Sequence, residues 1–306
     1  MAQMGIMIEG QNGLNWERWQ KLLRAAEALG FQCVFRSDHY SNAQPPDYDS
    51  LELWVSLTYA AAHTQRIEFG ALVTPVTFRQ PVLTARMAAQ VDALSGGRLV
   101  LGMGAGWQER EHKQFGIPFY DFTTRFAMLH EALELTTLLY DNTQPISFQG
   151  QYFSLTDAVL LPRAPRRPPL LIGGNGPQKT LPLVAKYADE WNAVFSPPER
   201  FRENNARLNE LLQQAGRKPG DVKRSLMHGV IYGGEAEVAD KAAALYHSDL
   251  ARARERGMLI GRGQQLVDQL GAYVDAGVER FMLQWLMLDD LDGLAALAQD
   301  VLKAFQ

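Results

Sequence analysis

Polar residues that could take part in chemistry come directly after short apolar segments of this chain. The clearest case is Ser37-Asp38-His39, which follows the apolar stretch 32–36. A histidine there could move a proton near neutral pH, because its unperturbed pKa lies close to that range. Asp38 could orient the imidazole, although neighbouring residues on an extended strand point to opposite sides. The alternative interpretation is a polar helix start with a solvent-facing histidine.

A second segment places glycines at alternate positions. Gly102, Gly104 and Gly106 follow an apolar run, and Trp107 comes next. Alternate glycines allow a flat ligand or another backbone to approach closely. Their spacing is not that of the dinucleotide-binding fingerprint. The segment therefore predicts a close approach without identifying what approaches.

A third segment, Gly173-Gly174-Asn175-Gly176, lies between an apolar stretch and a helical one that contains Thr180. A glycine loop that enters a helix presents free backbone N–H groups and the positive end of the helix dipole. We predict a phosphate site here. The alternative is a plain tight turn, which would not need three glycines.

Two charged runs receive structural interpretations. The run 109–113 contains Glu109, Glu111 and His112, but it lacks a metal-binding pattern such as His-Glu-x-x-His, so no metal site is predicted. It is interpreted as a solvated helical turn. The arginine-rich run 163–167 is interpreted as a solvated linker.

Composition excludes several classes of protein. The 306 residues are 46% hydrophobic and 21% charged, which is ordinary for a globular enzyme. A formal net charge of −4 argues against nucleic acid as a partner. No apolar run approaches the length of a membrane span, and the first residues lack the cationic segment of a secretory signal. The single cysteine, Cys33, agrees with a reducing setting, so we expect a cytoplasmic protein.

Strand and helix patterns alternate along the chain. This alternation, with apolar strands, predicts an α/β fold with parallel strands. A doubly wound open sheet would give the same alternation, but the count and the length favour a (β/α)8 TIM barrel. The predicted strands are eight: 4–9, 32–36, 66–73, 97–102, 170–172, 190–194, 225–232 and 279–284.

We expect a single domain over 1–306 with three insertions. They lie near 107–124, 141–169 and 248–262, and stretches of this length in a compact domain are usually functional or mobile. The second insertion contains a possible hairpin that turns at Gly150. In a TIM barrel, the carboxyl ends of all strands open onto one face, where the active site lies. The polar and glycine-rich segments should therefore meet in one pocket.

Taken together, these segments resemble the luciferase-like monooxygenase superfamily of barrels that use flavin or deazaflavin. The resemblance covers nearly the whole chain in consistent order. Within the superfamily, the Ser-Asp-His and Gly-Ala-Gly-Trp segments are most similar to members that use the deazaflavin coenzyme F420. The matching segments are 28–31, 37–39, 74–81, 92–98, 102–107 and 173–174.

The resemblance implies a cofactor ring at the mouth of the barrel, with a non-prolyl cis peptide behind it at Leu72–Val73 or Ala71–Leu72. It implies that His39 lies beside the reactive edge of the ring, with Asp38 behind it. The sugar-phosphate dehydrogenase branch has a glutamate where this chain has Trp107, which argues against sugar phosphates as substrates. Trp107 is instead expected to form a pocket wall with Trp285, and Glu109 is the nearest alternative acid. The expected cofactor-binding residues are Leu72, Val73, Thr74, Gly104, Ala105, Gly106, Gly173, Gly174, Asn175, Gly176 and Thr180.

The resemblance therefore leads to one expected function and two alternatives. The first is an F420-dependent oxidoreductase that transfers a hydride between C5 of the deazaflavin and a small organic substrate. The second is an FMN-dependent monooxygenase that uses O2 and reduced flavin from a separate reductase. The third is a flavin-binding protein without turnover. A homodimer is also implied, while a metal-dependent hydrolase lacks a ligand set.

Overall fold

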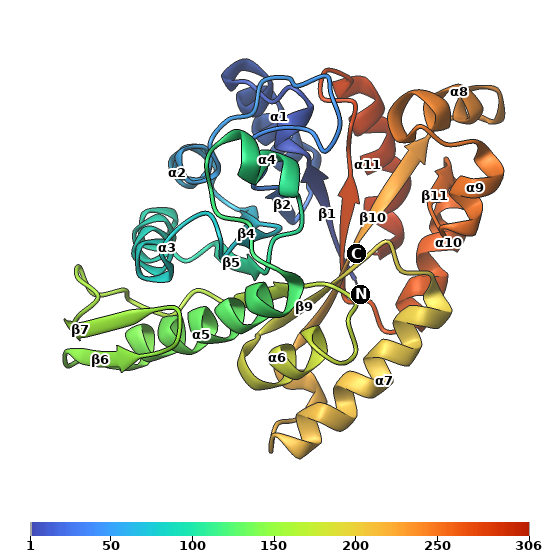
Figure 1. Cartoon of the computed structure of the whole chain (residues 1–306). Coiled ribbons are helices and arrows are strands. Elements are labelled where there is room, and N and C mark those ends of the chain that lie inside the picture. Colours follow the sequence, from blue (N-terminus) through green and yellow to red (C-terminus); the bar gives the residue numbers. More distant parts are fainter. Residues whose placement is uncertain (1, 306) are drawn as a thin grey trace.

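Eight parallel strands close into a barrel in the computed structural model, which describes residues 2–305 (Figure 1). Each strand pairs in parallel with the next, and the last pairs with the first, so the fold is a (β/α)8 TIM barrel as predicted. The barrel strands, in ring order, are β1 (Gln3–Ile8), β2 (Cys33–Arg36), β3 (Glu68–Ala71), β5 (Leu99–Gly104), β8 (Leu170–Gly173), β9 (Glu190–Val194), β10 (Lys223–Tyr232) and β12 (Arg280–Gln284).

Helices surround the barrel, and their ends follow local sequence signals. Helix α1 begins after Asn15, whose side chain accepts a hydrogen bond from the Arg18 N–H, and ends at Gly30 with a φ of 99°. Both signals were predicted. The other covering helices are α2 (Leu53–His63), α3 (Pro81–Ser95), α5 (Phe122–Asp141), α6 (Thr180–Tyr187), α7 (Pro198–Gln214), α8 (Glu235–Tyr246), α10 (Gln264–Asp275) and α11 (Leu291–Phe305), with short 3-10 turns η1 (Gly10–Asn12) and η2 (Pro219–Asp221).

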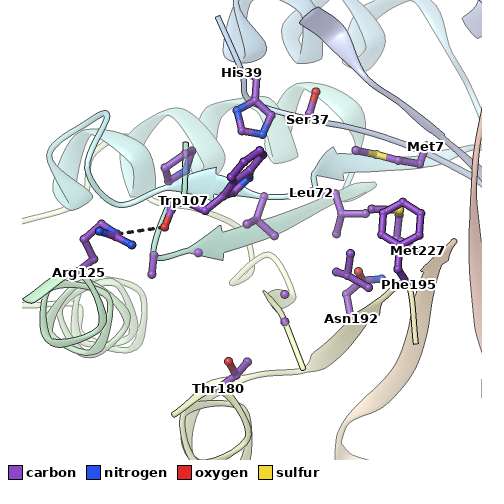
Figure 2. Close-up of a pocket in the computed structure, with 18 of the residues that line it drawn as sticks. Met7, Ser37, His39, Leu72, Trp107, Arg125, Thr180, Asn192, Phe195 and Met227 are labelled. Atoms are coloured by element: carbon purple, nitrogen blue, oxygen red, sulfur yellow. Dashed lines mark hydrogen bonds between the residues drawn. The ribbon is translucent and has the colours of Figure 1, made fainter. Parts of the chain in front are cut away.

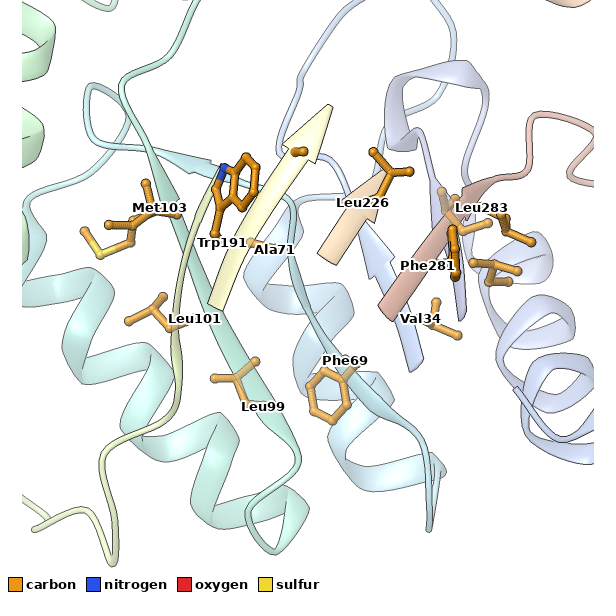
Figure 3. Packing of buried hydrophobic residues seen from close by; sticks show 14 of the residues in the cluster. Val34, Phe69, Ala71, Leu99, Leu101, Met103, Trp191, Leu226, Phe281 and Leu283 are labelled. Atoms are coloured by element: carbon orange, nitrogen blue, oxygen red, sulfur yellow. The ribbon is translucent and has the colours of Figure 1, made fainter. Parts of the chain in front are cut away.

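Alternation along the strands divides the buried residues between two layers. Residues that point outward pack under the helices, as Leu99, Leu101 and Met103 of β5 do in Figure 3. Residues that point inward form a separate cluster that fills the barrel, and Val100 of the same strand belongs to it. The strands are therefore apolar on both faces, as their sequences indicated.

Charged side chains close the amino-terminal end of the barrel. The guanidinium of Arg280 is buried and donates to the Glu190 carboxylate at 3.0 Å, to Gln3 at 2.8 Å and to Glu68. The buried Glu190 carboxylate could not be kept there at low cost without this cation. With one end closed by charge, the cavity opens only at the carboxyl ends of the strands.

The insertions contain more regular structure than their sequences indicated. The first contains helix α4 (Glu109–Gln114), and the second forms the predicted hairpin from β6 (Ile146–Gln149) and β7 (Ser154–Ala158). The third, 248–262, was expected to be a loop, which is wrong: it forms α9 (Leu250–Glu255) and β11 (Leu259–Gly261), and β11 pairs with β10. In the second insertion, Arg166 is no solvated linker, because it pairs with the buried Asp92 at 2.7 Å.

Two properties of the described residues bear on function. Within residues 2–305, no helix is both long enough and apolar enough to cross a membrane. The same range contains no group of three or more His, Cys, Asp or Glu side chains arranged to hold a metal ion.

Candidate functional site

A cavity of about 540 Å3 opens at the carboxyl ends of the barrel strands (Figure 2). Its walls are mostly apolar. The residues predicted for the site that line it are His39, Leu72, Val73, Gly104, Ala105, Gly106, Trp107, Gly173, Gly174 and Thr180. Segments far apart in sequence therefore meet in one pocket, as the barrel topology required.

His39 is held at the edge of this cavity by a buried carboxylate. Its Nδ1 lies 2.8 Å from Oε1 of Glu111, whose other oxygen accepts the Tyr40 N–H at 3.0 Å. The side chains of His39 and Glu111 are only 14% and 1% exposed. Nδ1–H therefore donates to Glu111, and Nε2 is left for a ligand.

The same contact sets the protonation of His39. Burial acts to lower the pKa of His39, but the hydrogen bond and the charge of Glu111 outweigh it, so the pKa is raised above its usual value. The indole of Trp107 meets the imidazole edge-on, with ring centroids 5.6 Å apart. His39 is thus a partly buried imidazole whose surroundings favour the charged form.

Asp38 does not orient the imidazole, so that prediction is wrong. Strand alternation turns His39 inward and Asp38 outward. The Asp38 carboxylate accepts from the Thr74 hydroxyl at 2.7 Å and from the Arg79 guanidinium at 2.6 Å. Asp38 and Thr74 are both buried and lie outside the cavity lining. They fix the shape of the loops behind the site and do not contact a ligand from this position.

The predictions for Glu109, on α4, and Trp285, just after β12, are also wrong. Glu109 is exposed and does not line the cavity, and it is Glu111, two residues later, that reaches His39. The run 109–113 is therefore not a solvated turn, because one face of α4 buries Glu111 and His112. Trp285 is 0% exposed and belongs to the outer core, so it shapes no pocket.

The alternate glycines accommodate the chain itself. The peptide bond Leu72–Val73 is cis, at the first of the two predicted positions. A Cβ on Gly104 would lie 2.4 Å from a methyl of Val73, and one on Gly102 would lie 2.0 Å from the Ala71 carbonyl oxygen. The glycines are thus needed for a bulge of protein that forms one cavity wall.

Some residues of the predicted phosphate loop line the cavity, and others hold the loop in place from behind. Gly173, Gly174 and Thr180 line the cavity. Asn175 lies behind them, where its side chain donates to the Val194 carbonyl at 2.6 Å and accepts the Val194 N–H at 3.0 Å. Gly176 accepts the Thr180 N–H at 3.0 Å. The loop is therefore pinned to β9, and its backbone faces the cavity.

Arg125 also lines the cavity, and no sequence pattern had indicated it. It projects from α5 and donates to the Gly106 carbonyl at 3.2 Å (Figure 2). Its guanidinium also stacks over the ring of Phe119, 4.1 Å from the ring centroid. Burial lowers the pKa of Arg125 below its ordinary value, but a guanidinium remains charged. Among residues 2–305, no carboxylate lies within ion-pair distance of Arg125, so its charge is available to an anion in the cavity.

Asn192 and Phe195 were also missed. Asn192 lines the cavity from β9, and its Oδ1 is buried without a hydrogen-bond partner. Phe195 follows at the end of the same strand with a φ of 45°, which is uncommon for a bulky residue. An apolar strand sequence does not reveal which of its residues end at a cavity.

Comparison with known proteins agrees with this geometry. The profile of the family described as luciferase-like monooxygenase matches residues 3–280. The chain is 32% identical over 231 residues to an F420-dependent hydroxymycolic acid dehydrogenase of Mycobacterium tuberculosis, covering 73% of this chain and 61% of that protein. It is 32% identical over 177 residues to pyrimidine monooxygenase RutA of Cronobacter turicensis, covering 56% and 46%. The chain thus spans less than two thirds of either relative.

Solved structures show the same fold over the whole chain. An F420-dependent secondary alcohol dehydrogenase, solved with an F420-acetone adduct, superposes with a TM-score of 0.90 at 19% identity. The match covers 100% of this chain and 99% of that one. At this identity, the likeness concerns the fold alone.

Proposed function

This chain belongs to the luciferase-like monooxygenase family, and on that basis we propose that it is an F420-dependent oxidoreductase acting on a small organic substrate. The observation that carries the proposal is the buried His39–Glu111 pair at the edge of a largely apolar cavity. The F420-dependent dehydrogenase among its relatives supports the choice of cofactor.

The residues around the cavity fit a flat cofactor that bears a phosphate. A Cβ on Gly174 or Gly176 would meet the Thr180 hydroxyl at 3.2 and 3.1 Å, so the loop has no room for side chains and presents its backbone. Gly173, Gly174, Thr180 and the cation of Arg125 would hold the phosphate. The apolar wall at Val73 would support the ring. Once bound, the cofactor would supply the hydride chemistry.

His39 would handle the proton that accompanies hydride transfer. Glu111 holds the imidazole through Nδ1, so Nε2 can give a proton to the substrate or take one from it. Trp107 stands beside the imidazole and is 64% exposed, at the opening of the cavity. A substrate packed against it would exclude water from His39.

A paired titration of the purified protein with F420 and FMN, followed by tryptophan fluorescence, tests the choice of cofactor. We expect F420 to bind with micromolar or tighter affinity and FMN much more weakly. Binding of neither cofactor would refute the proposal, and binding of either without turnover would favour the non-catalytic alternative.

The variant His39→Gln tests the proton role once a substrate is known. We expect it to keep F420 binding and to lose about 10²-fold or more in turnover, the usual contribution of a positioned general acid or base. The variant His63→Gln is a matched control, because His63 is an exposed histidine on α2. Full turnover by His39→Gln would remove His39 from the mechanism.

An FMN-dependent monooxygenase is the second candidate, favoured by the match to a pyrimidine monooxygenase. The same phosphate loop and apolar wall would serve FMN. O2 consumption with chemically reduced FMN, in the absence of F420, would support this alternative over the first.

A further inference from the structure

The carboxylate of Glu9 lines the cavity, and neither the cofactor nor the role proposed for His39 accounts for it. Glu9 follows β1 at the carboxyl end of the barrel and is half-buried. Its position on the ring is next to β2, whose end carries His39, and away from the phosphate loop after β8. Glu9 therefore faces the part of the cavity where a substrate would meet the proton carrier.

Neutral side chains alone hold Glu9 in place. Its Oε1 accepts from the Gln284 side chain at 2.7 Å, and its Oε2 accepts from the Gln11 side chain at 3.0 Å. Gln11 is fixed in turn, because its carbonyl accepts the Ser37 hydroxyl at 2.7 Å. Within the part of the chain that the structure describes, no lysine or arginine nitrogen lies within 4 Å of Glu9.

This arrangement differs from that of the other two carboxylates near the site. Asp38 is neutralised by Arg79, and Glu111 is paired with His39. A carboxylate in a partly buried, largely apolar cavity is stabilised most by a cation or by strong hydrogen-bond donors. Glu9 is oriented, but its charge has no direct partner in the protein.

We propose that Glu9, held by Gln11 and Gln284, is a substrate-recognition site for a hydroxyl or amine group on an otherwise apolar substrate. This inference rests on the proposed function, because the proposed function assigns the cofactor to the Gly173–Gly174 side of the cavity and leaves the Glu9 side for the substrate. It predicts that substrates carry a hydrogen-bond donor and that carboxylates are rejected. A donor held at Glu9 would place neighbouring carbon atoms of the substrate near His39.

A purely structural role for Glu9 is the competing explanation. Its contact with Gln284 connects the ends of β1 and β12, which are already joined by the parallel pairing Gln3–Met7 with Arg280–Gln284. A neutral glutamine could keep the bond from Gln284 through its one amide oxygen. The charge of Glu9 is therefore the property that an experiment should remove.

Three probes with one apolar body test the inference: cyclohexylamine, cyclohexanol and cyclohexanecarboxylate. Their binding to the F420-loaded protein and to the protein without cofactor is measured by saturation-transfer NMR and competition. We expect the wild-type protein to prefer the amine and the alcohol over the carboxylate. Glu9→Gln should weaken amine binding by about tenfold, the usual effect of losing a charge-assisted hydrogen bond. Glu17→Gln, on an exposed residue of α1, is the matched control.

The outcomes separate this inference from the proposed function. Unchanged F420 binding by Glu9→Gln, together with loss of amine preference, would support the recognition site. Equal or tighter binding of the carboxylate by the F420-loaded wild-type protein, in which the cofactor phosphate would occupy Arg125, would overturn it. If neither F420 nor FMN binds, the proposed function fails. The change in amine affinity that Glu9→Gln causes in the cofactor-free protein still decides the role of Glu9, because Arg125 is the same in both proteins.

Discussion

Replacing Glu111 by glutamine should lower the pKa of His39 and shift its imidazole toward the neutral form. The substitution keeps the size of the side chain and the acceptor for the Tyr40 N–H, which lies 3.0 Å away in the native protein. It removes the negative charge 2.8 Å from Nδ1 of His39. Burial then remains as the main influence on the imidazole, and burial favours the neutral form.

The expected size of the effect follows from the geometry. A charge-assisted hydrogen bond between groups this well buried contributes about 1.5–3 kcal/mol. Since about 1.4 kcal/mol is a factor of ten, the ratio of imidazolium to imidazole at a fixed pH should fall by about tenfold to a hundredfold. The pKa of His39 should therefore fall well below that in the native protein.

NMR titration of the histidine Cε1–H signals measures this directly, with His39→Gln used to assign the resonance. The same change should appear in stability. The raised pKa makes the pair contribute most below about pH 6.5, and this contribution is lost as pH rises through the folded pKa. The difference in unfolding free energy between native and Glu111→Gln proteins should therefore shrink with rising pH. An unchanged titration midpoint for His39 in Glu111→Gln would refute the reasoning.

Three further predictions concern the barrel. Gly104→Ala would put a Cβ 2.4 Å from a Val73 methyl and should destabilise the protein by about 1–3 kcal/mol in thermal unfolding, with loss of cofactor affinity. His228 is buried, and within residues 2–305 neither of its ring nitrogens has a hydrogen-bond partner. Burial lowers the pKa of His228 to about 4. The free energy of unfolding should therefore fall by up to about 3 kcal/mol as pH drops from 6.5 to 4. His228→Phe should lose this acid dependence in pH-dependent urea unfolding. Arg280→Met should cost about 3–5 kcal/mol in the same assay, because Glu190 is left buried without its cation.

The elements of the barrel were predictable because each depends on a local signal. Helix α1 is bounded by a capping asparagine and a left-handed glycine, and β9 (Glu190–Val194) and α10 (Gln264–Asp275) occupy the predicted ranges. An apolar run between two helices must pair with its neighbours, so the strand count led directly to the closed barrel. The strand in the third insertion was not predicted, because it lacks such a local signal. β11 (Leu259–Gly261) has only three residues, too few to show a recognisable period.

The candidate site was predictable only where a side chain belongs to the strand end itself. His39 and Gly174 lie at the cavity because strand geometry puts them there. Arg125 reaches it from α5, and Glu111 reaches His39 from α4. Both helices follow β5, and the positions of these side chains depend on how the helices fold back onto the barrel. The sequence shows that Glu111 lies four residues after Trp107. It does not show which acidic residue of α4 turns inward.

Asp38 and Glu111 together show what a charged residue near a barrel mouth needs before it can be assigned a role. Asp38 adjoins His39 in sequence, yet its charge is neutralised by Arg79 on the outer side of the strand. Glu111 lies 72 positions away and supplies the charge that Asp38 was expected to supply. Glu9 is paired with neither an arginine nor a histidine, because its two hydrogen-bond donors are the neutral side-chain amides of Gln11 and Gln284. Of the three carboxylates, Glu9 alone has no cationic partner among residues 2–305, which is why its removal should alter substrate preference. Because the charge of Glu9 also contributes to the raised pKa of His39, Glu9→Gln should lower that pKa too, while the His39–Glu111 hydrogen bond remains.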